Sequence, residues 1–349
     1  MAPQDIACVI HVHSTFSDGT ATVPEIAEAA RHANADAVLL TDHDTLAARR
    51  AGCEGWHDGV LVLVGTEVSP RGGHLLAFGI EREIDHAGRS EAELADAIAA
   101  AGGLSFPAHP FSAGSRMSRT IGRPHPWRTL EGSAVTGLEL WNVGTEGAER
   151  CRTPAELVRF LRRPEDAVVA PPATNLAAWD ALCRGRRLVA IGGLDAHQTG
   201  VRLSGRVLAF APNERAFATL RTRLILDRAL TGDVDSDAAA VYRALGAGRA
   251  YLAVEHEVPA RGFRFWATSP SGRTATFGDE VPAGEWNLSV ALPGRAELRL
   301  LRDGAEATRV EGSELERRVE EPGVYRVEAW RDGRAWILSN PIYLRRDPR

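Results

Sequence analysis

Short apolar runs that end at histidines or carboxylates are the feature that most constrains the fold of this 349-residue chain. Ile6–Ile10, Ala37–Thr41 and Val60–Gly65 have the length of strands and are almost entirely apolar, without the alternation of a strand that has one face in water. Continuous apolar strands are typical of parallel sheets covered on both faces. We therefore predict a parallel sheet flanked by helices in the first part of the chain.

Helical patterns alternate with further strand-length runs as far as about residue 250. Helices fit Glu25–His32, Ser90–Ala101, Pro154–Leu161, Asn175–Cys183, Glu214–Ala229 and Asp237–Leu245. Further strands fit Leu75–Ile80, Leu104–Pro107, Gly137–Trp141 and Leu188–Ile191. Because strands and helices alternate, the pattern predicts an α/β fold whose parallel sheet is either open or closed into a barrel.

The pattern changes after about Glu255 to alternating apolar and polar residues separated by turn sequences such as Pro-Ser-Gly and Asp-Gly. Strands fit Phe263–Thr268, Glu285–Ala291, Ala296–Leu301, Val324–Trp330 and Ala335–Ile342. Such spacing is typical of an antiparallel β-sandwich. The sequence predicts two domains, residues 1–255 and 256–349. The second would cap the first or mediate homo-oligomer formation.

Histidines and carboxylates follow the predicted strands of the first domain at the points where these strands end. His11 and His13 are two residues apart, so in extended chain both imidazoles face the same side. The carboxyl ends of the strands are where α/β folds gather functional groups. His74 breaks the pattern, since it precedes the run Leu75–Ile80. The candidate site comprises His11, His13, Asp18, His43, Glu67, His74, His109, Asp195 and His197.

Imidazole and carboxylate ligands together suit zinc, manganese or iron. The four cysteines have no C-x-x-C spacing, which argues against a structural zinc knot and predicts free thiols. Nine ligands are too many for one tetrahedral ion. They suffice for two or three divalent ions with a carboxylate such as Glu67 as a bridge.

Composition excludes several other functions. All 41 basic residues are arginine, so the chemistry of Schiff-base and P-loop lysines is excluded. The net charge of -5 gives no reason to expect an extended nucleic-acid duplex as a partner. The sequence shows no signal peptide and no apolar stretch of membrane-spanning length. We therefore expect a cytoplasmic protein without a membrane partner.

The motifs His11-Val-His-Ser-Thr-Phe-Ser-Asp-Gly19, Thr41-Asp-His-Asp-Thr45, Gly65-Thr-Glu67, His74, His109 and Asp195-Ala-His197 occur in this order. Together they resemble the polymerase and histidinol phosphatase (PHP) superfamily over about residues 6–255. The resemblance implies a distorted (β/α)7 barrel with a trinuclear metal centre. Its three ligand groups would be His11, His13, Glu67 and Asp195; then Glu67, His74 and His109; and then Asp18, His43 and His197.

Two details place the chain more finely within this resemblance. Asp18 stands where many family members have histidine, which looks like the branch that acts on nucleotide phosphates. The stretch Val241–Tyr251 and the tail Ser339–Tyr343 look like a two-domain branch that is often labelled carbaryl-hydrolase-like.

A water bridging such ions has its pKa lowered and becomes a nucleophile at neutral pH, so no residue nucleophile is needed. His197 or Asp44 is the candidate acid for the leaving group. Arginine binds phosphate bidentately, which makes the loop after His109 a candidate phosphate clamp. The residues predicted to bind substrate are Arg116, Arg119, Arg123 and Asn142.

The leading hypothesis is a phosphoesterase that hydrolyses small-molecule phosphomonoesters or phosphodiesters, including nucleotide-derived ones. A hydrolase of carbamates or carboxylic esters is the alternative within enzymes, since the same nucleophile attacks a carbonyl. A neutral substrate would need no arginine clamp. The alternative of another class is a non-catalytic binding protein that contains metal.

Overall fold

The computed structural model describes residues 3–117, 123–128, 130, 132–203, 206–209 and 211–346, with backbone alone at 201–203 and 206–209. The helices are α1 (Val23–His32), α2 (Ala47–Arg50), α3 (Glu91–Ala100), α4 (Val143–Arg150), α5 (Pro154–Arg162), the 3-10 helix η1 (Pro164–Ala167), α6 (Ala173–Gly185), α7 (Asn213–Phe217) and α8 (Val234–Gly246). The strands up to residue 254 are β1 (Gln4–Val12), β2 (Ala37–Leu40), β3 (Gly55–His57), β4 (Val60–Val64), β5 (Thr66–Val68), β6 (Leu75–Phe78), β7 (Leu104–Pro107), β8 (Gly137–Asn142), β9 (Val189–Gly193), β10 (Gly200–Leu203), β11 (Arg206–Ala209), β12 (Leu220–Leu226) and β13 (Ala250–Val254).

Parallel strands form the centre of the N-terminal part, as the apolar runs predict. Val9 of β1 pairs with Val38 of β2, and Val38 pairs with Val62 of β4. All three residues are buried. β8 and β9 also run parallel to each other. The α/β class is therefore as predicted.

The described strands do not close into the predicted (β/α)7 barrel. Among the described strands, β5, β6 and β7 form a separate three-stranded sheet in which β6 is antiparallel to both neighbours. β12 and β13 are antiparallel to their neighbours β1 and β12. The carboxyl ends of β1, β2 and β4 nevertheless lie at one edge, which is where the candidate ligands follow.

The helix predicted over Glu214–Ala229 is wrong beyond its first turn. α7 ends at Phe217, and the chain continues as the buried strand β12. Two arginines separated by one residue favour the strand, because both contact carboxylates of neighbouring segments. Arg221 and Arg223 lie 3.3 Å and 3.0 Å from Glu255, and Arg223 lies 2.8 Å from Asp5. Extended backbone places both guanidinium groups on the same face of the sheet.

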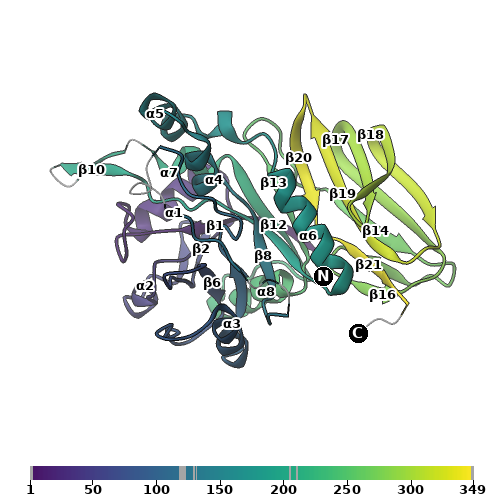
Figure 1. Ribbon diagram of the computed structural model, residues 1–349, viewed down its shortest axis with the longest axis horizontal. Coiled ribbons are helices and arrows are strands. Elements are labelled where there is room, and N and C mark those ends of the chain that lie inside the picture. Colours follow the sequence, from purple (N-terminus) through teal and green to yellow (C-terminus); the bar gives the residue numbers. More distant parts are fainter. Residues whose placement is uncertain are drawn as a thin grey trace.

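Strands make up the C-terminal part, and their pairings are antiparallel, as predicted, except that β16 runs parallel to β21 (Figure 1). They are β14 (Arg264–Thr268), β15 (Thr274–Thr276), β16 (Glu280–Pro282), β17 (Trp286–Arg302), β18 (Ala305–Val319), β19 (Gly323–Arg331), β20 (Arg334–Ser339) and β21 (Ile342–Arg345). β17 pairs with β14 along its first half and with β19 along its second half. β18 was not predicted, because most of its side chains are exposed and polar.

The two parts of the chain share one sheet. β13 pairs with β20, so the central sheet continues into the C-terminal strands, and α6 lies along this junction (Figure 1). Asn340 fixes the junction, since its amide bonds with Ala190 and Ala250 at 2.9 Å each. The division at residues 255 and 256 therefore stays a prediction.

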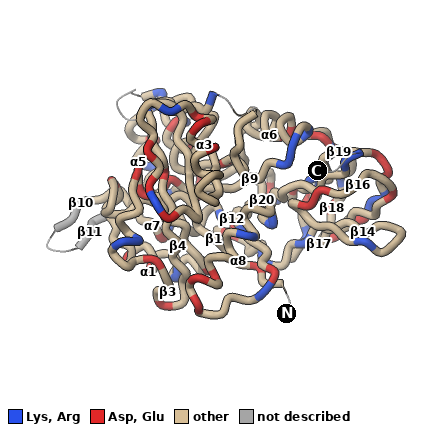
Figure 2. Tube along the Cα trace, turned by 90° about the horizontal axis from the view of Figure 1, so that it is seen from below, with Lys and Arg blue, Asp and Glu red and all other residues tan. Residues whose placement is uncertain are grey.

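Arginines and acidic residues are interspersed over both parts of the described chain (Figure 2). Within the described residues, no helix has the length and apolar character needed to cross a membrane.

Candidate metal centre

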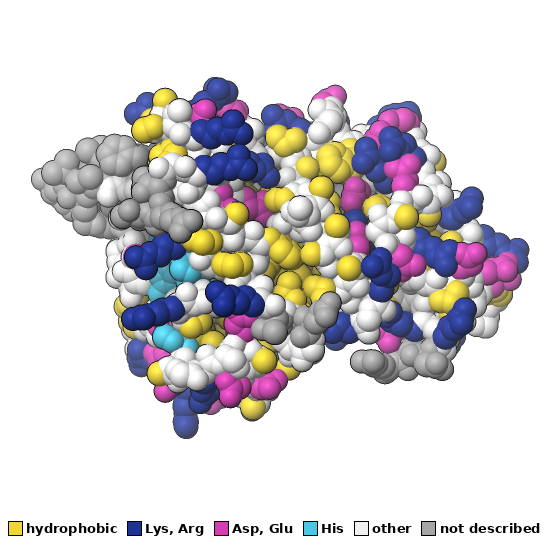
Figure 3. Space-filling view, viewed as in Figure 1, with side chains coloured by type: hydrophobic (Ala, Val, Ile, Leu, Met, Phe, Trp, Pro, Cys, Tyr) yellow, Lys and Arg dark blue, Asp and Glu magenta, His cyan; other side chains and the backbone are white. Residues whose placement is uncertain are grey.

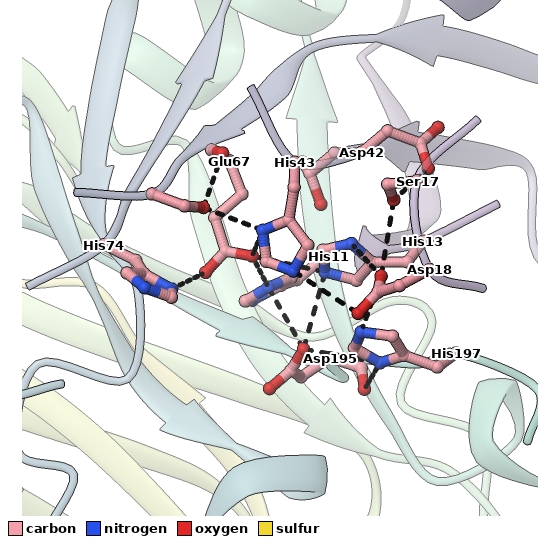
Figure 4. Close-up of polar contacts among 12 residues, drawn as sticks. His11, His13, Ser17, Asp18, Asp42, His43, Glu67, His74, Asp195 and His197 are labelled. Carbon is pink, nitrogen blue, oxygen red and sulfur yellow. Dashed lines mark hydrogen bonds and ion pairs between the residues drawn. The ribbon is translucent and has the colours of Figure 1, made fainter. Parts of the chain in front are cut away.

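All nine predicted ligands converge at one edge of the N-terminal sheets, and Figure 4 labels all of them except His109. His11 lies in β1, and His13 and Asp18 follow this strand. His43 follows β2, and Glu67 lies in β5. His109 follows β7, and Asp195 and His197 follow β9. His74 directly precedes β6, which is antiparallel to β5 and β7. The start of β6 therefore lies beside the ends of the parallel strands, and His74 lies there with it.

Glu67 is at the centre of this cluster and is 1% exposed. Its Oε2 lies 3.3 Å from Nε2 of His11, 3.3 Å from Nε2 of His13 and 3.2 Å from Nδ1 of His43. Its Oε1 lies 2.9 Å from Nδ1 of His74 and 3.3 Å from Nε2 of His109. One carboxylate thus faces five imidazoles, which is the arrangement expected of a ligand that bridges two ions.

The ligand atoms fall into three groups, each with its atoms within 4.8 Å of one another. The groups are His11, His13, Glu67 and Asp195; His43, Glu67 and His74; and His13, Asp18, His43 and His197. The first group is the one that the resemblance implies. The other two differ in part, because His43 replaces His109 in the second group and His13 joins the third.

Buried ligand atoms lack hydrogen-bond partners within the described chain. They are Nε2 of His11, both ring nitrogens of His13, Oε2 of Glu67 and Nδ1 of His109. Buried polar atoms are rarely left unpaired, because each loses its hydrogen bonds to water. Divalent cations would satisfy several of these atoms at once, so the donor set fits metal ions with imidazole and carboxylate ligands.

In two histidines, a hydrogen bond at Nδ1 fixes the tautomer and leaves Nε2 without a proton. Nδ1 of His11 donates to Glu139 Oε1 at 2.8 Å. Nδ1 of His197 donates to the backbone oxygen of Asp195 at 3.0 Å, because a carbonyl only accepts. Nε2 of each ring is then free to bind a cation, and such second partners also hold the ring in position.

Burial and carboxylates act against each other on the pKa values of the histidines. Burial lowers the pKa of His11, but the carboxylates of Glu139, Glu67 and Asp195 raise it well above its usual value. For His13, burial is likewise outweighed by Asp195 and Glu67, which raise the pKa to about 9. A cation held by these rings would therefore have to displace protons from them.

The acidic ligands respond in the opposite direction. Burial raises the pKa of Asp18, but His197 outweighs it and lowers the pKa to about 2. The pKa of Glu67 is also well below its usual value, because its histidine neighbours outweigh its burial. Both carboxylates are thus ionised at neutral pH, as metal ligands must be.

Backbone strain is concentrated in the same place. His11, His109 and Asp195 have φ angles of 66°, 33° and 52°, in the left-handed region that residues other than glycine rarely adopt. Each costs about 1–3 kcal/mol, which the surrounding structure must offset. Strain of this kind clusters at functional sites because it orients side chains that regular strands would point elsewhere.

The cluster opens into a cavity of ≈ 710 Å³. Figure 3 shows histidine side chains at the surface of the N-terminal half, with arginine side chains beside them. Among the described residues, Arg123 lines this cavity and Arg116, which is exposed, does not. Arg119 lies outside the described residues. His125 also lines the cavity, with its ring centroid 4.2 Å from that of His74.

Two predicted roles do not agree with the structure. Asn142 was predicted to bind substrate, but it is 0% exposed. Its amide accepts from the backbone N–H of Thr145 at 2.7 Å and donates to Glu139 at 2.9 Å, so it caps α4. Asp44 was a candidate acid, but its carboxylate accepts from the backbone N–H of Ser69 at 2.8 Å and lies 3.5 Å from His86. Asp44 does not line the cavity among the described residues.

Two buried carboxylates that hold the candidate ligands were not predicted from the sequence to have this role. Glu139 in β8 bonds to the His11 ring and accepts from the backbone N–H of His109 at 2.6 Å. Asp42 accepts from Ser14 N–H at 2.8 Å and from Ser17 Oγ at 2.6 Å, which fixes the turn that carries Asp18. A carboxylate within a buried apolar run was the available signal for Glu139.

Comparisons with known proteins agree with the motifs. Residues 10–103 match the PHP domain family. A 79-residue stretch is 39% identical to the phosphoribosyl 1,2-cyclic phosphate 1,2-diphosphodiesterase of Eggerthella lenta, covering 21% of this chain and 30% of that protein. The chain thus spans less than a third of the length of this relative. The family match confirms the predicted resemblance over residues 10–103.

Two solved structures are similar at low identity. A two-domain protein from Bacteroides vulgatus, containing a predicted PHP-like metal-dependent phosphoesterase, is 14% identical with a TM-score of 0.46, over 97% of this chain and 95% of that one. An amidohydrolase from Chromobacterium violaceum, with bound sulfate and no metal, is 16% identical with a TM-score of 0.33, over 54% of this chain and 87% of that one.

Proposed function

We propose that this chain, which contains a PHP domain at residues 10–103, is a metal-dependent hydrolase of phosphoric esters. The observation that carries the proposal is the position of Glu67, whose two oxygens face five imidazoles in a buried cluster with unpaired ligand atoms. A structural metal site would not need so many ligands beside an open cavity.

Two or three divalent ions, manganese, zinc or iron, are the proposed cofactors. His11, His13 and Asp195 would hold one ion together with Glu67, and the groups around His74 and His197 would hold the others. When bound, such ions lower the pKa of coordinated water and neutralise charge on a phosphoryl group. Glu67 would bridge, because its Oε1 and Oε2 face different imidazoles.

The proposed role of His197 is that of a ligand. Its Nδ1–H is donated to a backbone carbonyl, and its Nε2 faces Asp18 Oδ1 at 3.2 Å. A nitrogen that binds a cation has no proton to give, so the two roles predicted for His197 exclude each other at this atom.

Arg123 is the proposed phosphate contact, since it lines the cavity with a guanidinium group that matches phosphate oxygens. The substrate would be a small molecule, because a cavity of ≈ 710 Å³ has the size of pockets that bind small molecules. The name of the Eggerthella lenta relative specifies a phosphodiester, which favours including diesters in the test.

The test is hydrolysis of three chromogenic substrates by manganese-loaded protein: an aryl phosphomonoester, an aryl phosphodiester and a neutral aryl carbamate. The control is His11→Ala, which removes a ligand and reveals contaminating activity. We expect turnover of at least one phosphoester by the wild type and none by the variant. Turnover of the carbamate alone would replace the proposal with the carbonyl alternative. The absence of all three activities would favour the non-catalytic alternative.

A further inference from the structure

The cavity beside the metal centre has a second wall of different chemistry. Phe160 and Leu161 of α5, Pro164 of η1 and Ala216 of α7 supply apolar surface to it. Phe160 packs directly on α4, since a Cβ at Gly147 would lie 2.2 Å from its ring. A phosphate needs no such wall, so this surface suits another part of the substrate.

Asn213 lies in this second wall and is 1% exposed. Neither its Nδ2 nor its Oδ1 has a hydrogen-bond partner within the described chain. The backbone N–H of Asn213 donates to Gln198 Oε1 at 3.4 Å, so only the side-chain amide is left unpaired. A buried amide without partners destabilises the fold unless something else supplies its hydrogen bonds.

The other buried asparagines show that this chain pairs such amides. Asn142 bonds to Thr145 and Glu139. Asn175 donates to the Leu140 carbonyl at 3.1 Å and to Glu146 at 3.0 Å. Asn340 bonds to the backbone at three points. Asn213 differs from these three, because its side-chain amide is unpaired within the described chain. Of the four, Asn213 alone lines the cavity.

We propose that Asn213, Phe160 and Leu161 form a specificity subsite for the organic group of the substrate. The amide offers a donor and an acceptor side by side, so it fits a group that presents an acceptor beside a donor, as amides and nucleobases do. The apolar wall fits the face of a planar ring. The inference rests on the proposed function, because it assigns the phosphoryl end of the same substrate to the metal centre.

The test is calorimetric binding of phosphate esters to manganese-loaded protein. The probes are the four common nucleoside 5′-phosphates, which carry such edges in different orders. Phenyl phosphate is the aromatic ring without a hydrogen-bonding edge, and ribose 5-phosphate is the ester without an aromatic ring or base. The variant is Asn213→Leu, which keeps the number and branching of the side-chain heavy atoms and removes the amide's donor and acceptor. Thr199→Ala is the matched control, since Thr199 is exposed in the same cavity.

We expect at least one nucleoside phosphate to bind about tenfold or more tightly than phenyl phosphate, because a ligand without the edge leaves the amide unpaired. Asn213→Leu should abolish this difference while binding phenyl phosphate as the wild type does, and Thr199→Ala should preserve it. The melting temperature of Asn213→Leu should be no lower than that of the wild type, because no hydrogen bond within the described chain is lost.

Three outcomes contradict the inference. Nucleoside phosphates that bind no more tightly than phenyl phosphate overturn it, and so does an Asn213→Leu variant that keeps the wild-type preference. A lower melting temperature for this variant would identify the amide as structural. If no phosphate ester binds at all, the proposed function itself fails, which distinguishes that failure from a failure of the subsite alone.

Discussion

The carboxylate of Glu139 lies 2.8 Å from Nδ1 of His11, and both side chains are fully buried. Nε2 of the same ring points toward Glu67 Oε2 at 3.3 Å and Asp195 Oδ1 at 3.4 Å. Glu139 therefore holds the tautomer in which Nδ1 carries the proton and Nε2 is available to a cation.

Glu139→Gln should weaken manganese binding about 10–100-fold, the effect typical of losing such a partner. The reason is that a neutral amide supports the His11 ring less strongly and need not select its tautomer. Calorimetric titration with manganese measures the affinity. Glu328→Gln is the control, since Glu328 is a buried carboxylate that bonds to Arg326 and Trp330 in the C-terminal part. Equal affinity in wild type and Glu139→Gln would contradict the positioning role.

Gly193→Ala should weaken manganese binding by displacing the same carboxylate. A Cβ at Gly193 would lie 1.8 Å from Glu139 Oε1, so this group would have to move. We expect a lower melting temperature as well, because Glu139 is buried and paired. Gly185→Ala is the matched control, since a Cβ at this helix-end position has no neighbour within 4 Å. Wild-type manganese affinity in the Gly193→Ala variant would show that Glu139 can shift without consequence.

The affinity for manganese should rise with pH between about 6.5 and 9. His13 has its pKa raised to about 9, so below this pH its ring carries a proton that a cation must displace. Each displaced proton changes the apparent affinity by about tenfold per pH unit. Titrations at several pH values measure this slope, and a flat profile over this range would contradict the assignment of His13 as a ligand.

The metal-free protein should show the opposite trend in stability. A histidine whose pKa is raised on folding stabilises the folded state below its unfolded pKa of about 6.5, and this contribution is lost as the pH rises through about 9. The melting temperature of the chelator-treated protein should therefore fall over the range in which manganese affinity rises.

The convergence of the candidate ligands could be predicted because most of them lie at the ends of continuous apolar runs. His11 lies near the end of β1, His13 follows this strand and His43 follows β2. Both strands are buried on both faces, so the strands themselves fix where these histidines lie. His74 is part of the family motifs, but it precedes a strand, whereas the other candidate ligands were expected at the carboxyl ends of parallel strands. β6 is antiparallel to β5, so the start of β6, and His74 directly before it, lies at the same edge as the other candidate ligands.

The parts that could not be predicted depend on contacts between distant residues. Arg223 is compatible with a helix in its local sequence, and only Asp5 and Glu255 make an extended, buried conformation favourable. Glu139 resembles any strand residue until His11, 128 positions away, is placed beside it. The apolar pattern left open whether the sheet closes, because hydropathy does not record strand direction, and the closed barrel that the resemblance implied is not found among the described strands.

Arg123→Ala should lower kcat/KM for a phosphoester, mainly through a higher KM, whereas Arg116→Ala should leave both constants near the wild-type values. The difference follows from position: both arginines are exposed, but only Arg123 lines the cavity among the described residues. Loss of one contact between arginine and phosphate at an exposed site is expected to change KM about tenfold. Steady-state kinetics with the aryl phosphoester measure both constants, and the neutral carbamate tests whether the effect follows charge. Equal constants for Arg123→Ala and the wild type would remove Arg123 from the substrate site, because a phosphate bound by the metal centre alone would not depend on it.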